Sequence, residues 1–468
     1  MKLGLLIPPS SGKRKIIRAI DCSHESKADY LWQPNDFMIL SSLLEPEDEL
    51  VFIDGTADAM TQEAFLSEVN KVSSLDILVF ALSSVCWELD LDYFLQVKKR
   101  FPETSSFVIG DIFLEKTYRE YILKECCGII FQPYEVDLKE MANAHTMPQE
   151  ETLGGICRMI HDIPFPSGKK NSTIEEEVIR FPRHEIFQKE GYSFPFAKRF
   201  AYATVTTLWG CPFSCSYCTD SQIPPVTRGY KSVCAELDYL ANLGIHELFF
   251  ADKTFGFPKE NIFPLLEYMG KNHHFSWSCY FHPQFYTPEL FDAMHKAGCH
   301  TIIIGIDSAN LGSLKQYKRN VQNEKVDDLI QKANELNWNI CADFILGLEH
   351  ETEEDVIATM NYGVHLPIDF ASFNIAAPLP GSDIREKAQR EGKLSFGKEG
   401  YDTFGHEVVL ENEHISVERL LKLRKKAILS FYLRFSYLLR RIKRTTSLQH
   451  FIIQFRQMKA MFLKSKIL

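Results

Sequence analysis

One segment of the chain reads Leu208-Trp209-Gly210-Cys211-Pro212-Phe213-Ser214-Cys215-Ser216-Tyr217-Cys218-Thr219-Asp220 and carries three cysteines in the spacing CxxxCxxC. It follows directly on a strand-like run, residues 203–208. Cysteine thiolates hold iron-sulfur clusters, and a cubane with three protein ligands keeps one iron open to another molecule. The spacing therefore predicts that Cys211, Cys215 and Cys218 bind a 4Fe–4S cluster and form the catalytic centre.

Other uses of these cysteines are weaker. Cys215 and Cys218 alone form a CxxC pair, which also occurs in thioredoxin-like redox sites and in zinc sites. A structural zinc site needs a fourth nearby ligand, and no second CxxC or HxxxH pair follows within the next thirty residues. The other nine cysteines have no ligand spacing and are expected to be reduced and mostly buried: Cys22, Cys86, Cys126, Cys127, Cys157, Cys234, Cys279, Cys299 and Cys341.

The composition is that of a folded globular protein, with 45% hydrophobic and 24% charged residues. At 468 residues the chain is too long for one ordinary core, so two or three domains are expected. The apolar start, residues 1–9, is too short for a signal peptide and predicts a first strand. Free cysteines without an export signal predict a reducing, cytoplasmic location.

Residues 1–140 alternate short apolar runs with helical patterns. Five runs are continuously apolar, as expected of strands buried on both faces of a parallel sheet: 2–7, 49–54, 76–83, 106–110 and 128–132. Such a doubly wound, Rossmann-like domain binds its ligand at the carboxyl ends of the strands. The small residues Ser10, Ser83 and Gly110 at those ends are therefore candidate cofactor-binding positions, although turn formation alone also explains them.

The remaining chain divides into three predicted parts. Residues 141–200 are mixed in character and indicate an interdomain linker. Residues 201–390 repeat a strand-helix unit at least six times, which predicts a partial or full (β/α) barrel with its active site at the carboxyl ends of the strands. Residues 391–468 are predicted to be helical. The barrel strands are expected at 203–207, 247–251, 275–280, 301–306, 339–346 and 369–377, with helices such as 233–243, 288–297 and 326–336 between them.

The cysteine segment resembles the signature of radical S-adenosylmethionine (SAM) enzymes, in which SAM chelates the open iron and is cleaved to a 5'-deoxyadenosyl radical. In that family the aromatic residue before the third cysteine contacts the adenine through its backbone, which implies that role for Tyr217. The run Phe250-Ala251-Asp252-Lys253-Thr254-Phe255 resembles the DxTF-like element of the cobalamin-dependent branch. The resemblance implies that Asp252 meets the SAM amino group.

Three further elements resemble the family in the expected order. Residues 294–299 resemble M-x-x-A-G-C, and the run Gly305-Ile306-Asp307-Ser308 resembles G-I-E-S with Asp in place of Glu. This implies a SAM contact from Asp307 or Ser308, with a shorter reach. Residues 347–352 resemble G-L-P-G-E-T with its Pro and Gly replaced, which predicts an altered turn rather than altered chemistry, and residues 378–382 resemble a terminal P-x-P-G-T.

A doubly wound domain before such a barrel resembles the cobalamin-binding domain of cobalamin-dependent radical SAM enzymes, which include C- and P-methyltransferases and a porphyrin-ring cyclase. The chain lacks the Asp-x-His-x-x-Gly motif that supplies a histidine to cobalt, as do many members of this branch, so bound cobalamin and a scaffold-only sheet both fit. The resemblance implies modification of an unactivated carbon, by methyl transfer or by cyclisation or rearrangement. It also implies an electron donor such as flavodoxin or ferredoxin.

Two other functions stay open. A methylthiotransferase would hold a second cluster on three N-terminal cysteines, here Cys22, Cys86 and Cys126, but such enzymes end in a β-rich RNA-binding domain and this C-terminus is predicted to be helical. A radical SAM fold that has lost turnover would act as a binding protein, and the intact cysteine triad argues against that.

The C-terminal tail is basic. From Arg419 onward there are fourteen Lys and Arg and no Asp or Glu, in a chain whose net charge is −10. No apolar stretch approaches the roughly 20 residues that cross a bilayer. A basic amphipathic helix predicts peripheral contact with anionic lipid at the inner face of the membrane, or else its apolar face packs on the barrel. Nucleic-acid binding is not expected because the rest of the chain is acidic.

The substrate is not identified by any motif; a small or lipid-like molecule is expected. His24, Trp32, Cys279 and His282 are weaker candidates for lining its pocket, since each residue type is more often structural. Cys279 lies on a predicted barrel strand, and its side chain is expected to face the barrel interior.

Overall fold

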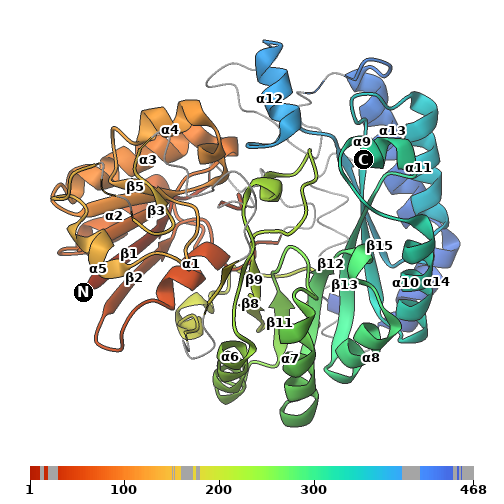
Figure 1. The fold of residues 1–468 in the computed structure, drawn as a ribbon, viewed down its shortest axis with the longest axis horizontal. Coiled ribbons are helices and arrows are strands. Elements are labelled where there is room, and N and C mark those ends of the chain that lie inside the picture. Colours follow the sequence, from red (N-terminus) through yellow and green to blue (C-terminus); the bar gives the residue numbers. More distant parts are fainter. Residues whose placement is uncertain are drawn as a thin grey trace.

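The computed structural model describes residues 1–10, 15–18, 30–149, 151, 153–159, 172–174, 180–392, 410, 412–445, 451, 452 and 455. These residues form two α/β units that lie side by side, each built on its own sheet (Figure 1). Helix α12 (Asp383–Arg390) lies above the junction between the two units. The predicted fold class is therefore confirmed.

The N-terminal sheet has the strand order β2-β1-β3-β4-β5-β6. Its first five strands are parallel, and β6 runs antiparallel to β5. The strands are β1 (Lys2–Ile7), β2 (Glu49–Asp54), β3 (Ile77–Ala81), β4 (Ser105–Ile109), β5 (Gly128–Ile130) and β6 (Ile156–Cys157). The helices between them are α1 (Asn35–Ser41), α2 (Gln62–Lys71), α3 (Trp87–Arg100), α4 (Lys116–Ile122) and α5 (Leu138–Asn143).

Apolar side chains cover both faces of this sheet. On β3, Leu78 and Phe80 join one buried cluster, whereas Ile77 and Val79 join the cluster on the opposite face. Successive side chains of a strand point to opposite faces, so a continuous apolar run is what a doubly covered sheet requires. The order β2-β1-β3-β4-β5 reverses direction between β1 and β3, and ligands of such sheets bind at this switch point.

The second sheet is open and entirely parallel, in the order β15-β14-β13-β12-β11-β8. Its six strands form a partial barrel: β8 (Ala203–Val205), β11 (Glu247–Phe250), β12 (Ser276–Phe281), β13 (Cys299–Asp307), β14 (Asn339–Leu346) and β15 (Phe370–Ile375). The helices are α6 (Tyr230–Asn242), α7 (Lys259–Asn272), α8 (Pro288–Lys296), α9 (Leu311–Gln316), α10 (Asn323–Glu335) and α11 (Glu353–His365). All predicted strands of both sheets lie within two residues of the observed ones.

Parts of the predicted linker belong to ordered structure. Strand β6 lies inside residues 141–200 and completes the edge of the N-terminal sheet. A small third sheet joins β7 (Ser172–Thr173), β10 (Val226–Thr227) and β9 (Leu208–Trp209). Gln33 ties the two units together, because its side-chain amide donates to the Phe187 and Tyr202 carbonyls and accepts from the Thr204 backbone amide.

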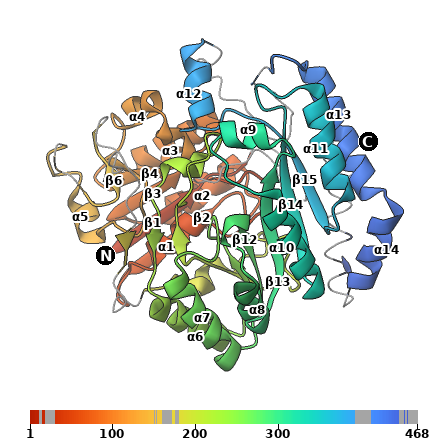
Figure 2. The same ribbon diagram turned by 45° about the vertical axis from the view of Figure 1, so that its right-hand side comes forward.

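Two helices of the basic tail lie along the outer edge of the partial barrel (Figure 2). Helix α13 (Val417–Tyr432) packs its apolar face on the barrel, with Leu420, Leu423 and Phe431 in the main core cluster. Helix α14 (Phe435–Arg444) follows it. Among the described residues, no helix is both long enough and apolar enough to cross a membrane.

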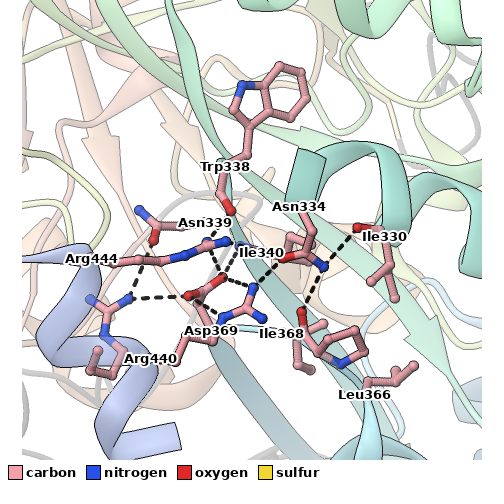
Figure 3. A network of polar contacts seen from close by, with 12 residues as sticks. Ile330, Asn334, Trp338, Asn339, Ile340, Leu366, Ile368, Asp369, Arg440 and Arg444 are labelled. Carbon is pink, nitrogen blue, oxygen red and sulfur yellow. Dashed lines mark hydrogen bonds and ion pairs between the residues drawn. The ribbon is translucent and has the colours of Figure 1, made fainter. Parts of the chain in front are cut away.

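Helix α14 is held to the barrel by its charged side chains. Arg440 Nε lies 3.0 Å from one carboxylate oxygen of Asp369, and Arg444 Nη1 lies 2.7 Å from the other (Figure 3). The Asp369 side chain is completely buried, and Asn334 on α10 accepts from both arginines. The apolar face of α13 thus packs on the barrel, which is one of the two expectations for the tail. Helix α14 attaches through its polar face instead.

Candidate functional site

The three cysteines lie on one closed loop at the mouth of the barrel. The loop starts after β9 rather than directly after the first barrel strand, and the Cys211 amide donates to the Ile223 carbonyl at its far end, at 3.3 Å. A tight turn brings the Cys218 amide to the Cys215 carbonyl, at 3.1 Å. Gly210 precedes the loop at φ 73°, where an added Cβ would lie 2.4 Å from the Pro224 carbonyl oxygen. Only glycine fits there.

The thiols are partly shielded from water. Cys215 is buried, Cys211 and Cys218 are partly buried, and all three are free of disulfides. Burial and the neighbouring Asp220 raise the pKa of the Cys218 thiol well above its usual range. Binding to iron deprotonates such a thiol. Within the described ranges, no three His, Cys, Asp or Glu side chains gather closely enough to hold a single ion; in a cubane each thiolate binds a separate iron.

Asp252 supports the start of this loop. It is completely buried, and one carboxylate oxygen accepts from the Thr207 and Leu208 amides at 2.7 and 3.0 Å while the other accepts from the Thr207 hydroxyl. Burial raises the pKa of Asp252 to about 6. In this structure its hydrogen bonds run to the chain that leads into the cysteine loop, so it acts as a positioning residue there.

Asp307 meets the cysteine loop from β13. Its backbone has φ 68°, next to an irregularity in the pairing of β13 with β14. One carboxylate oxygen accepts from the Tyr217 hydroxyl at 2.9 Å and lies 2.6 Å from Arg319 Nε. The structure therefore brings two predicted site residues, Tyr217 and Asp307, into direct contact. Ser308 turns the other way, because its hydroxyl donates to Glu351 at 2.7 Å inside the core.

Arg319 is a site residue that the motifs did not reveal. It follows α9, and its Nη1 lies 3.9 Å from Cys215 Sγ. Tyr317, two residues earlier, accepts the Ser216 amide on its backbone carbonyl at 3.0 Å. Both contacts join positions about a hundred residues apart, so no local spacing pattern could have found them.

Three predicted positions lie at the carboxyl edge of the N-terminal sheet. The Ser10 hydroxyl is 2.9 Å from that of Thr56, and Ser83 donates its amide and hydroxyl to Asp90. An added Cβ on Gly110 would lie 2.1 Å from the Leu82 carbonyl oxygen, so a glycine is needed for the loops after β3 and β4 to touch. Asp90 also forms a buried ion pair with Arg18, at 2.9 Å. The edge is thus ordered by polar contacts at the switch point.

A pocket lies between the two units and is lined by both. The N-terminal unit contributes Arg18 and residues 32–36, and the barrel side contributes Thr204, Lys253 and Tyr280. Asp220 and Gly210 line it as well, so the pocket reaches the cysteine loop. The pocket thus touches the carboxyl edges of both sheets.

The weaker pocket candidates have different outcomes. Trp32 lines the pocket, although a structural role was the favoured expectation for it. His282 stacks on Phe213 of the cysteine loop, with ring centres 3.8 Å apart, and burial lowers its pKa to about 2, so it stays neutral.

Cys279 packs in the cluster beneath the outer helices, so the expectation that it faces the interior was wrong. The inward positions on β11 and β12 are held by Phe249 and Tyr280. Cys22 and His24 lie outside the described residues.

A family model for the radical SAM superfamily matches residues 206–363. Residues 206–363 are therefore a radical SAM domain. The match includes all three cysteines as well as Asp252, Asp307 and Arg319. The domain implies a 4Fe–4S cluster and SAM, and the residues fit them: three thiols on one shielded loop leave one iron of a cubane without a protein ligand.

Relatives extend the likeness from this domain to most of the chain. An uncharacterized methyltransferase from Pyrococcus horikoshii is 27% identical, over 93% of this chain and 93% of its own length. The radical SAM methyltransferase TsrM from Kitasatospora setae, solved with cobalamin and a 4Fe–4S cluster, matches with a TM-score of 0.63 at 17% identity, over 85% of this chain and 79% of its own. The cobalamin-dependent enzyme OxsB, solved with aqua-cobalamin and SAM, matches with a TM-score of 0.62 at 12% identity, over 99% of this chain and 72% of its own. The chain therefore has the fold of these two solved enzymes.

Proposed function

We propose that this protein is a cobalamin-dependent radical SAM methyltransferase that modifies an unactivated carbon of a small molecule. The observation that carries the proposal is the pocket between the cysteine loop and the switch-point edge of the N-terminal sheet. When bound, SAM on the reduced cluster supplies a carbon-centred radical, and methylcobalamin supplies a methyl group. Named methyltransferases among the relatives support this reading over cyclisation.

The chain's own residues would position these groups and exclude water. We assign Cys211, Cys215 and Cys218 to the cluster, and the backbone at Tyr217 together with Asp307 to SAM. Ser10, Ser83 and Gly110 lie at the edge where cobalamin would bind, with Arg18 and Asp90 ordering that edge. Trp32 and Tyr280 would close the pocket around the substrate. A low-potential one-electron donor of the flavodoxin or ferredoxin class would reduce the cluster.

The test is product analysis with anaerobically purified protein, reconstituted with iron, sulfide and cobalamin and given SAM and a strong reductant. Methyl transfer would consume two SAM molecules, one giving 5'-deoxyadenosine and the other giving S-adenosylhomocysteine as it replaces the methyl group that was transferred, so both products are expected. Formation of 5'-deoxyadenosine alone would favour a cyclase or rearrangement enzyme. If neither product forms, the proposal is contradicted. An iron content of about four atoms per chain, rather than about eight, would exclude the second cluster of a methylthiotransferase.

The matched control for this test is another buried cysteine. Cys215→Ala should abolish both products and lower the iron content. Cys234→Ala changes a cysteine of equal exposure, 7%, on α6, and should leave both unchanged. Equal turnover by the two variants would mean that the cysteine loop is not the site.

We also propose that α14 makes a peripheral contact with anionic lipid. Its charged residues attach it to the barrel, while Phe435, Leu438, Leu439 and Ile442 are exposed, at 74, 44, 44 and 73%. These positions are spaced three and four residues apart, so they form one stripe along the helix. The exposed apolar residues Phe451, Ile452 and Phe455 follow in the tail. The arginines of α14 pair with Asp369, so the positive charge offered to an anionic surface comes from exposed neighbours such as Lys425 and Lys426 on α13.

A further inference from the structure

All three guanidinium nitrogens of Arg319 have partners, and one of these partners is in the cysteine loop. Nη1 lies 3.9 Å from Cys215 Sγ, Nη2 donates to the Gly305 carbonyl at 2.6 Å, and Nε pairs with Asp307 at 2.6 Å. The side chain is 9% exposed. An added Cβ on Gly305 would lie 2.7 Å from Nη2, so glycine at that position makes the approach possible. The contact with the sulfur is therefore built into the fold.

Asp307 holds the compensating charge, and it pairs with Nε of Arg319 rather than with Nη1, the nitrogen that contacts the sulfur. Its carboxylate forms an ion pair with Arg319 and accepts a hydrogen bond from the Tyr217 hydroxyl. Residue 307 lies at φ 68°, beside the irregular pairing of β13 with β14. A cation thus contacts Cys215 directly, and its anion is one contact further away.

This arrangement has an electrostatic consequence for any cluster bound by Cys215. Reduction adds one electron, and hydrogen bonds to the sulfurs and nearby charge set the reduction potential of an iron-sulfur cluster. A positive charge beside the sulfur favours the reduced state, whereas a negative charge disfavours it. Because both side chains are at least nine-tenths buried, solvent and salt screen them weakly.

We propose that Arg319 raises the reduction potential of the cluster held by Cys211, Cys215 and Cys218, and that Asp307 offsets part of this effect. Arg319 is a positioning residue: it acts on the cluster through Cys215. This inference rests on the radical SAM cluster and requires neither cobalamin nor methyl transfer.

The experiment is a redox titration of the reconstituted protein without SAM or substrate, followed by electron paramagnetic resonance of the reduced cluster. Arg319→Gln removes the cation and should lower the equilibrium constant for one-electron reduction about tenfold, which is about 59 mV for a one-electron couple. Asp307→Asn removes the anion and should shift the potential upward. A structural disturbance alone gives no reason for opposite signs.

Lys318→Gln is the matched control. It removes the same charge one residue earlier, but Lys318 is 59% exposed and pairs with Asp383, so the potential should not move. If Arg319→Gln fails to hold a cluster, Arg319→Lys keeps the charge and Asp307→Asn still tests the sign. A shift of the two variants in the same direction, or no shift beyond that of Lys318→Gln, overturns the proposal. Loss of methyl transfer with these shifts intact would count against the proposed function alone.

Discussion

At the scale of single residues, the site is organised by buried carboxylates that hold the cysteine loop in place. Asp252 accepts two backbone amides and a hydroxyl from the turn before the cysteine loop. Asp307 joins the end of β13 to the loop itself. Both residues were expected to contact SAM, and the structure shows that they also hold the cysteine loop in place. A local motif does not predict this role, because their partners are distant in the sequence.

Asp252→Ala should destabilise the protein and reduce cluster binding. The substitution leaves the buried amides of Thr207 and Leu208 without their acceptor, at a cost of about 3 kcal/mol in unfolding free energy. Urea denaturation and iron content after reconstitution measure the two effects. Asp92→Ala, at an exposed carboxylate bonded to Gln96, is the control and should cost less than about 0.5 kcal/mol. Equal losses in both variants would contradict the role of Asp252.

The same carboxyl group gives a pH dependence. Burial raises its pKa to about 6, so the folded state holds this proton more tightly than the unfolded chain does. The contribution to stability is complete below about pH 4 and is lost as the pH rises through 6, by up to about 3 kcal/mol. Asp252→Asn cannot ionise and should lack this slope. Parallel pH profiles of the two proteins in urea denaturation would show that the carboxyl group does not titrate there.

At the scale of elements, α14 is unusual because its charged side faces the protein. Three arginines converge on Asp369, and Arg441 also lies 4.5 Å from the centre of the Phe370 ring. Amphipathic helices of globular proteins normally turn their apolar stripe to the core. The reversed orientation leaves Leu438 and Ile442 outward, where a lipid surface would cover them.

Leu438→Ser combined with Ile442→Ser should weaken binding to phosphatidylglycerol vesicles about 100-fold, since each buried aliphatic side chain contributes about 1.5 kcal/mol or more. Vesicle flotation measures the change, and phosphatidylcholine vesicles should bind neither protein. Leu311→Ser, at a 50% exposed leucine on α9, is the control. A chain ending after Thr445 shows whether α14 suffices. Unchanged flotation of the double variant would rule out a contact through this stripe.

At the scale of the whole molecule, function depends on how the two units face each other. Glu115 lies between β4 and α4 in the sequence. Its carboxylate forms an ion pair with Arg385 and accepts a hydrogen bond from Gln389, both on α12. Glu115 and Arg385 are both buried, at 7% and 3% exposure. Together with Gln33, this contact fixes the distance between the switch-point edge and the cysteine loop, and therefore the size of the pocket.

Glu115→Ala should loosen this junction. It leaves the Arg385 charge buried without its partner, which costs about 3–5 kcal/mol. We expect faster hydrogen exchange in α12 and easier proteolysis between the units. Asp383 lies on α12, as Arg385 does, and forms an exposed ion pair with Lys318. Asp383→Ala breaks this pair and should change the free energy of unfolding by less than about 1 kcal/mol. Similar exchange rates in both variants would show that the contact does not hold the units together.

The sequence by itself determined the element pattern and predicted the cluster ligands and the radical SAM domain, because strand burial and ligand spacing are local properties of consecutive residues. Continuous apolar runs such as 77–81 marked each sheet strand, and CxxxCxxC marked the candidate cluster loop. Only the tertiary structure decided that Arg319 contacts Cys215, that Cys279 packs outward and that α14 turns its charges inward. These depend on contacts between residues far apart in the chain, whose pairing is set by how the sheets and helices pack.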